Sequence, residues 1–162
     1  GCLPPDLGID FEEAWREHPP ERGSICLAGH VTPTPRWIQS YLRPYHFSGS
    51  WHAAKDLLCV FRPLVEWARH YLRHHLQISS YTFDQVLVNW YNGHNYIGAH
   101  SDAEKDLIPC APIMSVSLGQ ERVFRVKYKD KKSEAAQTHG VIAYSTSMKN
   151  RSFIVMGGRC QQ

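Results

Sequence analysis

Two side chains that could hold a metal ion stand two positions apart, at His100 and Asp102. Successive side chains of an extended segment leave on opposite sides, so residues two apart share a side. An imidazole nitrogen and a carboxylate oxygen could therefore both reach one metal ion. This His-x-Asp pair is the sharpest local feature of the sequence and the first candidate for chemistry.

Taken alone, the pair has two interpretations. With a second, remote histidine it would form the two-histidine, one-carboxylate triad of non-haem Fe(II) oxygenases, which leaves coordination positions open for other ligands. The chain also contains 10 histidines, so the spacing arises easily by chance, and an Asp–His hydrogen bond at a strand end is the alternative. Three of the other histidines (His70, His74 and His75) fall together on a predicted helix, and none of the nine receives a metal role.

The elements that would position the pair are one clear helix followed by a series of short strands. Apolar residues recur at helical spacing over 63–76, and Pro63 suits a first helical position. Beyond that helix the period becomes two, and strands are predicted over 84–91, 96–100, 113–118, 122–128, 140–145 and 152–156. Seven of the 10 prolines fall in the first 44 residues, which predicts loops there, with a short helix over 11–17. This pattern favours an α+β fold whose strands form a sandwich or barrel-like pair of sheets.

Length and charge narrow the class of protein. The 162 residues are enough for one domain, and no apolar run is long enough for a membrane span or a signal-peptide core. Residues 1–24 carry six acidic and two basic side chains, so from a net charge of +3 the remainder carries +7. Its densest basic strip, 121–132, could contact phosphates, although a solvated hairpin is the simpler interpretation of this stretch alone.

The 5 cysteines are widely spaced and form no C-x-x-C pair. Such spacing without a leader predicts reduced thiols and an intracellular, reducing compartment, the nucleus or cytoplasm. We expect a monomer that does not bind membranes.

The residues around His100 resemble a known family. The order is a strand ending in Asn89-Trp90-Tyr91, then Ile97-Gly-Ala-His-Ser-Asp102, then Pro112-Ile-Met-Ser-Val-Ser-Leu-Gly119. This order and spacing resemble the AlkB family of Fe(II)- and 2-oxoglutarate-dependent dioxygenases, which remove alkyl groups from nucleic-acid bases. The resemblance runs from about residue 83 to 158 and more faintly upstream, through Pro35-Arg36 and Tyr45-His-Phe-Ser-Gly49.

The resemblance implies a fold and a domain organisation. The fold would be α+β, a double-stranded β-helix (jelly-roll) with supporting helices. Residues 1–50 would form a loop-rich nucleotide-recognition segment and residues 51–162 the oxygenase core, within one structural domain.

The resemblance also implies a set of site residues. His100 and Asp102 would ligate Fe(II), and Asn89 and Tyr91, on one face of their strand, would contact the cosubstrate 2-oxoglutarate. Glu104 would lie near the alkylated base of a DNA or RNA substrate, although a surface acid is the alternative. Arg36 belongs to the matched recognition segment, and Tyr41, or the nearby Trp37 or Tyr45, would stack on an extruded base unless it simply packs in the core.

The family pattern includes a further histidine ligand and a 2-oxoglutarate-binding arginine after the strand that ends near Gly157-Gly158, and neither is found in this sequence. We therefore expect the sequence to be part of a longer domain whose remaining residues supply them. The alternatives are an oxygenase of this fold that acts on a protein or small molecule, a non-catalytic nucleic-acid-binding module with a defective metal site, and a histidine-rich zinc domain.

Overall fold

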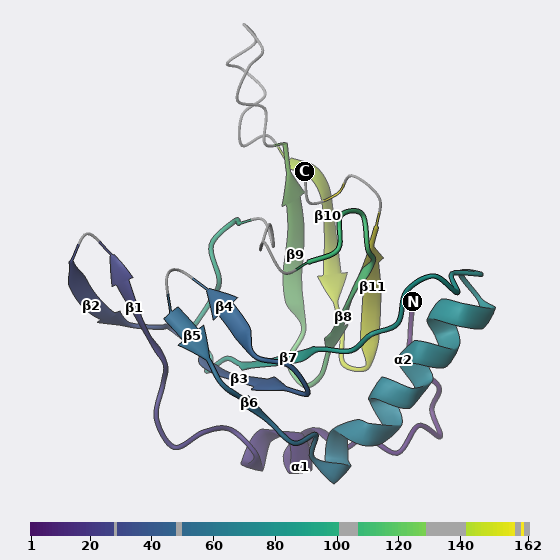
Figure 1. The fold of residues 1–162 in the computed structure, drawn as a ribbon, viewed down its shortest axis with the longest axis horizontal. Helices are drawn as coiled ribbons and strands as arrows, with labels where there is room; N and C mark the ends of the chain where they lie inside the picture. The colour runs from purple at the N-terminus through teal and green to yellow at the C-terminus, as the bar shows by residue number, and fades with distance from the viewer. Residues whose placement is uncertain (28, 48–49, 101–106, 129–141, 158–159, 161–162) are drawn as a thin grey trace, which may run out of the picture. The chain divides into compact units, whose positions relative to one another are not determined.

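The computed structural model describes residues 1–27, 29–47, 50–100, 107–128, 142–157 and 160 (Figure 1). The chain divides into two compact units, one formed by Asp6–Ile97 and the other by Gly1–Pro5 together with Gly98–Gln162. No helix within the described ranges is long and apolar enough to cross a membrane.

A three-stranded sheet organises the unit Asp6–Ile97. Its central strand β3 (Trp37–Tyr41) pairs in parallel with β6 (Ala54–Lys55) and antiparallel with β7 (Val86–Trp90). Two hairpins precede and follow β3: β1 (Ser24–Leu27) with β2 (His30–Pro33), and β4 (Tyr45–Phe47) with β5 (Ser50–His52). Gly29 stands at the turn of the first hairpin with a φ of 82°, a conformation that glycine adopts at no steric cost.

Two helices complete this unit. In α1 (Phe11–Arg16), the Asp10 side chain accepts a hydrogen bond from the Glu13 backbone N–H at 3.0 Å, as helix-capping carboxylates do. The short 3-10 helix η1 (Cys59–Phe61) leads into α2 (Arg62–His74), which has Pro63 in its first turn. The buried side of α2 consists of Val65, Ala68 and Leu72.

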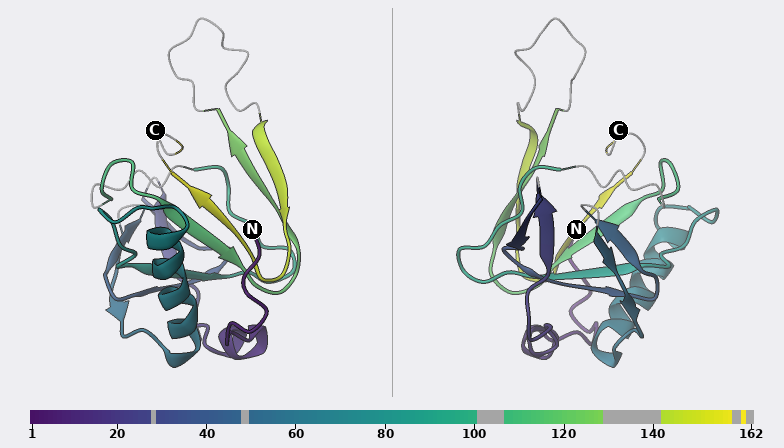
Figure 2. Two further views of the ribbon diagram at one scale, coloured as in Figure 1. Left: turned by 90° about the vertical axis from the view of Figure 1, so that its right-hand side faces the viewer. Right: turned by 60° about the vertical axis from the view of Figure 1, so that its left-hand side comes forward.

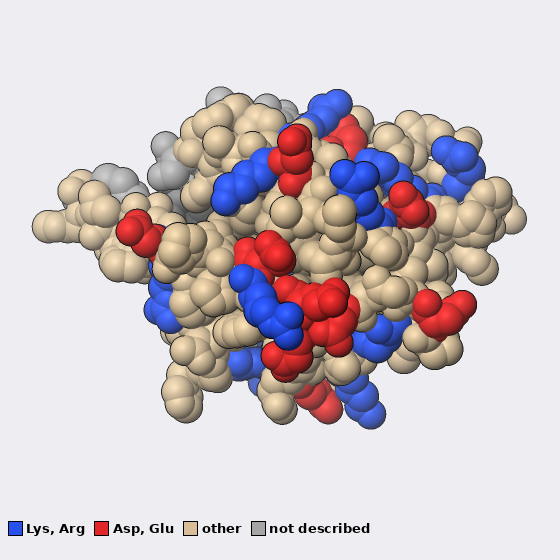
Figure 3. All heavy atoms as spheres, turned by 90° about the horizontal axis from the view of Figure 1, so that it is seen from below, with Lys and Arg blue, Asp and Glu red and all other residues tan. Residues whose placement is uncertain are grey.

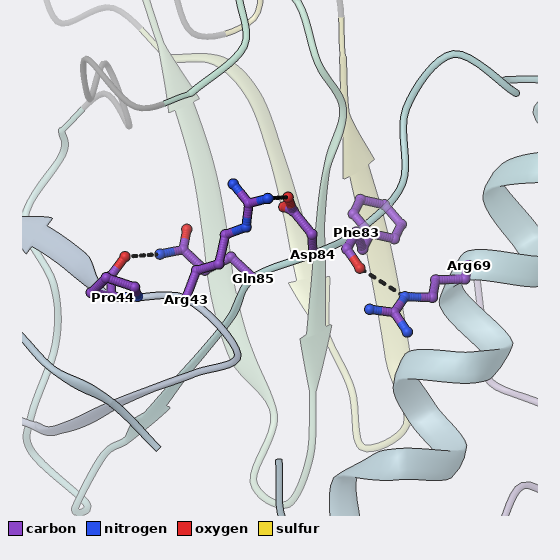
Figure 4. A network of polar contacts seen from close by, with 6 residues as sticks. All are labelled: Arg43, Pro44, Arg69, Phe83, Asp84 and Gln85. Atoms are coloured by element: carbon purple, nitrogen blue, oxygen red, sulfur yellow. Dashed lines mark hydrogen bonds and ion pairs between the residues drawn. The ribbon is translucent and has the colours of Figure 1, made fainter. Parts of the chain in front are cut away.

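Aromatic side chains fill the core between these elements. The Phe61 ring lies 5.6 Å from the Tyr41 ring and 6.4 Å from the Trp90 ring, measured between centroids. The segment that enters β7 is tied down by polar contacts on both sides (Figure 4). Arg43 pairs with Asp84 at 2.9 Å, Gln85 donates to the Pro44 carbonyl, and Arg69 of α2 donates to the Phe83 carbonyl.

The second unit contains two antiparallel strand pairs (Figure 2). Strand β8 (Ile113–Ser117) pairs with β11 (Ser152–Met156), and β9 (Arg122–Lys127) pairs with β10 (Ile142–Met148). The first residues of the chain lie beside β11. Cys2 forms an isolated antiparallel β-bridge with Ser152, and the terminal amine of Gly1 donates to the Phe153 carbonyl at 2.9 Å.

Most of the predicted elements are confirmed. Helix α2 lies within two residues of the prediction, β7, β8 and β9 lie within their predicted ranges, and β11 matches at both ends. The strand predicted over 96–100 is wrong, since those residues are exposed and form no ladder with described residues. The proline-rich start is less loop-like than predicted, because β1, β2 and β3 all lie within it.

Candidate functional site

The predicted cosubstrate residues Asn89 and Tyr91 lie at the end of β7, on either side of Trp90. The Trp90 ring is 5% exposed and donates its indole N–H to the Ala14 carbonyl at 2.7 Å, so it faces the core. Asn89 and Tyr91 are half-buried instead. The period-two prediction that these two side chains share a side fits this alternation.

Arg36, a residue of the same unit, contacts Asn89. Its Nε–H donates to Asn89 Oδ1 at 2.8 Å, and the side chain is almost fully enclosed, at 5% exposed. The Thr34 hydroxyl lies 2.7 Å from the Arg36 carbonyl and 3.1 Å from the Gly23 carbonyl, which holds the backbone just before β3. The guanidinium is thus placed by local structure before any ligand is present.

The donors left at this place suit a small anion. Burial raises the pKa of the Tyr91 phenol, and the positive charge of Arg36 opposes part of that rise. The phenol therefore keeps its proton at neutral pH. Asn89 uses its oxygen on Arg36, and within the described ranges neither its amide nitrogen nor the Tyr91 hydroxyl has a hydrogen-bond partner. An amide NH₂ and a phenol O–H beside a buried cation can bind a carboxylate.

His100 has the backbone contact that many metal-binding histidines make. Its Nδ1 lies 2.8 Å from the Gly98 carbonyl oxygen, and because a carbonyl can only accept, this contact places a proton on Nδ1. In the neutral ring the lone pair is then on Nε2, the nitrogen that would bind a metal ion. Asp102 and Glu104 lie outside the described residues, and within them no group of three or more His, Cys, Asp or Glu could hold a metal ion.

Tyr41 does not offer a surface for base stacking, and that prediction is wrong. The side chain is 1% exposed and packs against Phe61 in the core. Burial, with a smaller effect from the charge of Glu17, raises the pKa of its phenol to about 12. The alternative interpretation, core packing of an aromatic residue, is the correct one here.

The other aromatic candidates differ in accessibility. The half-buried Trp37 ring stacks on His18 at 4.8 Å and carries the Arg22 guanidinium at 4.5 Å from its centroid. Tyr45 is half-buried, with its ring 6.4 Å from that of His52. Trp51 of β5, which the sequence reasoning missed, is 64% exposed. The signal that could have found it is its place between Ser50 and His52, since alternation in a short hairpin puts one residue in two outward.

Four of the other histidines differ in their surroundings. On α2, the rings of His70 and His74 lie 4.2 Å apart on an exposed face, and His75 stacks on Tyr71. His52 differs from these: its Nε2 is buried without a partner among the described residues. Burial, then the charges of Arg36 and His46, lower the pKa of His52.

The basic strip is only partly described. Arg122, Arg125 and Lys127 of β9 are exposed, and residues 129–132 lie outside the described residues. On the face drawn in Figure 3, basic and acidic side chains are interspersed rather than separated. That face therefore does not present a surface of one charge.

Comparisons with known proteins identify the family to which the chain belongs. The family model described as "2OG-Fe(II) oxygenase superfamily" matches residues 10–162. The human protein named "DNA oxidative demethylase ALKBH2" is 36% identical over 92 residues, which cover 56% of this chain and 33% of that protein. Its mouse namesake is 42% identical over 59 residues, 36% of this chain and 25% of that protein.

The bovine protein of the same name is 40% identical over 58 residues, 35% of this chain and 21% of that protein. The matched segments thus span a third or less of each of these relatives. The resemblance to the AlkB family is confirmed, and the family model covers nearly all of the sequence. The chain belongs to the 2OG-Fe(II) oxygenase superfamily.

Proposed function

We propose that the protein to which this chain belongs is an Fe(II)- and 2-oxoglutarate-dependent dioxygenase that oxidatively removes alkyl groups from nucleic-acid bases. The observation that carries the proposal is the group Arg36, Asn89 and Tyr91: the buried Arg36 donates to Asn89, and its positive charge acts on the Tyr91 phenol. A dicarboxylate such as 2-oxoglutarate needs such donors at one end.

The residues fit the cofactor in their chemistry. The neutral His100 ring would present Nε2 as a lone-pair donor, and Asp102 would supply the carboxylate two positions on. When bound, Fe(II) and 2-oxoglutarate would together activate O₂ so that an N-alkyl group is hydroxylated and lost as an aldehyde. Asn89 and Tyr91 would hold the cosubstrate by hydrogen bonds from the amide NH₂ and the phenol O–H.

The substrate class is supported by the relatives and by exposed side chains. All three relatives carry the name of a DNA oxidative demethylase. Trp51 offers an exposed aromatic face, and β9 carries the exposed Arg122, Arg125 and Lys127. Stacking on aromatic rings and phosphate contacts are the usual means of holding an unpaired nucleotide. Glu104 remains our proposed acceptor for the base.

The direct test measures succinate release with 2-oxoglutarate and N-methylated oligonucleotides of DNA and RNA, single- and double-stranded. We expect release that requires a methylated strand, is lost in Asp102→Ala and persists in Asp106→Ala, a matched change four residues away. Equal turnover of the wild type and Asp102→Ala would reject the ligand assignment. Succinate release that does not depend on the oligonucleotide would favour a protein or small-molecule substrate. Tight oligonucleotide binding without succinate release would favour a non-catalytic module.

A further inference from the structure

We propose that Arg36 is a positioning residue for the cosubstrate: it fixes the Asn89 carboxamide so that the NH₂ group points to the ligand. This inference rests on the proposed function. It changes the role of Arg36, which the resemblance alone placed in the recognition of the nucleotide.

A carboxamide can be turned in two ways, with its oxygen and nitrogen exchanged. A guanidinium has only donors, so a contact of 2.8 Å from Arg36 Nε selects the orientation with Oδ1 toward Arg36. The opposite orientation would place NH₂ against N–H and lose a charge-assisted hydrogen bond. With the oxygen held, both hydrogens of the Asn89 nitrogen remain for an anionic ligand.

The register of the sheet makes the contact possible. Ile38 of β3 stands opposite Asn89 of β7, and Arg36 lies two residues before Ile38, just outside the start of the strand. The Thr34 hydroxyl, with Thr34 itself 2% exposed, holds the Arg36 carbonyl at 2.7 Å. Because backbone and side chain are both enclosed, the amide is oriented in advance and binding need not order it.

The buried charge has a second consequence for the ligand. Arg36 also acts on Tyr91, the other predicted cosubstrate residue, through its positive charge. A dianion held by Asn89 and Tyr91 would therefore bind near a cation that solvent barely screens. Arg36 thus favours 2-oxoglutarate both by orienting one donor and by supplying a positive field at both.

The test is a double-mutant cycle that combines Arg36→Met with Asn89→Ala. The readout is the Kd of 2-oxoglutarate by isothermal titration, with Mn(II) in place of iron so that no turnover occurs. We expect each single variant to weaken binding about tenfold, and the double variant to weaken it by clearly less than the roughly hundredfold loss that two independent effects would give. Arg73→Met is the matched control, because Arg73 is an exposed arginine of α2 in the same unit, and its Kd should equal that of the wild type.

Two further variants keep the test decisive if Arg36→Met unfolds. Arg36→Lys keeps the charge but not the Nε–H donor, and we expect the KM for 2-oxoglutarate to rise while kcat with saturating cosubstrate changes less than twofold. Asn89→Asp keeps the partner of Arg36 and removes the NH₂ group, so the melting temperature should hold while the Kd rises at least tenfold. A merely structural role for Arg36 would instead lower the melting temperature and leave the Kd unchanged.

The possible failures are distinguishable. If the wild type binds 2-oxoglutarate and folded Arg36→Met or Arg36→Lys binds it equally well, the positioning role is overturned and the proposed function stands. Additive effects in the cycle would also overturn it, because independent residues do not act through one another. If the wild type with Mn(II) does not bind 2-oxoglutarate, both the inference and the proposed function fail.

Discussion

The indole N–H of Trp90 donates to the backbone carbonyl of Ala14 at 2.7 Å, across 76 positions of the sequence. This hydrogen bond joins helix α1 to strand β7, and Trp90 stands between the two predicted cosubstrate residues. One buried contact therefore holds in place the strand end that carries Asn89 and Tyr91.

Trp90→Phe should lower the free energy of unfolding by about 2 kcal/mol, because it leaves the Ala14 carbonyl without its partner and removes buried volume. Urea unfolding monitored by circular dichroism measures the change. Trp51→Phe is the matched control, since Trp51 is 64% exposed, and its effect should stay within about 0.5 kcal/mol. Equal effects of the two substitutions would show that the Trp90 contact adds nothing to stability.

Part of the fold could be predicted from the sequence, where periodicity reports packing. Strand β11 matches its prediction at both ends because its apolar run is bounded by turn residues. The strand predicted over 96–100 failed because an alternating pattern cannot supply a partner, and a ladder needs one. The prolines predicted loops where the structure has strands. Pro33 ends β2 and Pro44 directly precedes β4, so these prolines lie at the borders of strands.

The candidate site also has a part that the sequence predicts and a part that it does not. The spacing of Asn89 and Tyr91 is local and could be predicted, whereas the contact of Arg36 with Asn89 depends on the register of two strands 53 positions apart. Tyr41 was misplaced because a sequence does not show which aromatic residue enters the core.

Trp51 and Tyr41 should differ in their effect on nucleic-acid binding. Trp51→Ala should weaken binding of a single-stranded oligonucleotide about tenfold, since aromatic stacking contributes about 1–3 kcal/mol per base. Tyr41→Leu removes the ring but keeps an apolar side chain, and it should leave binding unchanged because the Tyr41 ring is enclosed. Fluorescence anisotropy at two salt concentrations measures both variants, and circular dichroism checks that each is folded. Weaker binding by folded Tyr41→Leu with unchanged Trp51→Ala would restore Tyr41 as the stacking residue.

Metal uptake should depend on His100 and not on the histidines of α2. The exposed pair His70 and His74, four residues apart on one helix, could itself capture a divalent ion and confuse the assay. We therefore expect His70→Ala/His74→Ala to retain one Mn(II) per chain, and the further change His100→Ala to abolish it. Inductively coupled plasma mass spectrometry after gel filtration measures the stoichiometry. Retention of Mn(II) by the triple variant would remove His100 from the metal site.

The stability of the protein should fall in mild acid because of His52. Its Nε2 is buried without a partner among the described residues, and burial, Arg36 and His46 lower its pKa below the ordinary value of 6.5. In the unfolded chain the imidazole takes up a proton near pH 6.5, whereas in the folded chain it stays neutral to a lower pH. Between these two pKa values the unfolded state binds more protons, so the free energy of unfolding falls as the pH falls, and above pH 6.5 the effect vanishes.

Urea unfolding at several pH values between 5 and 8 tests this role of His52. The free energy of unfolding should fall less with acid for His52→Phe than for the wild type. Trp51→Phe, an exposed and non-titrating neighbour of His52, is the control and should keep the wild-type pH dependence. Identical pH profiles for His52→Phe and the wild type would show that His52 is equally easy to protonate in both states.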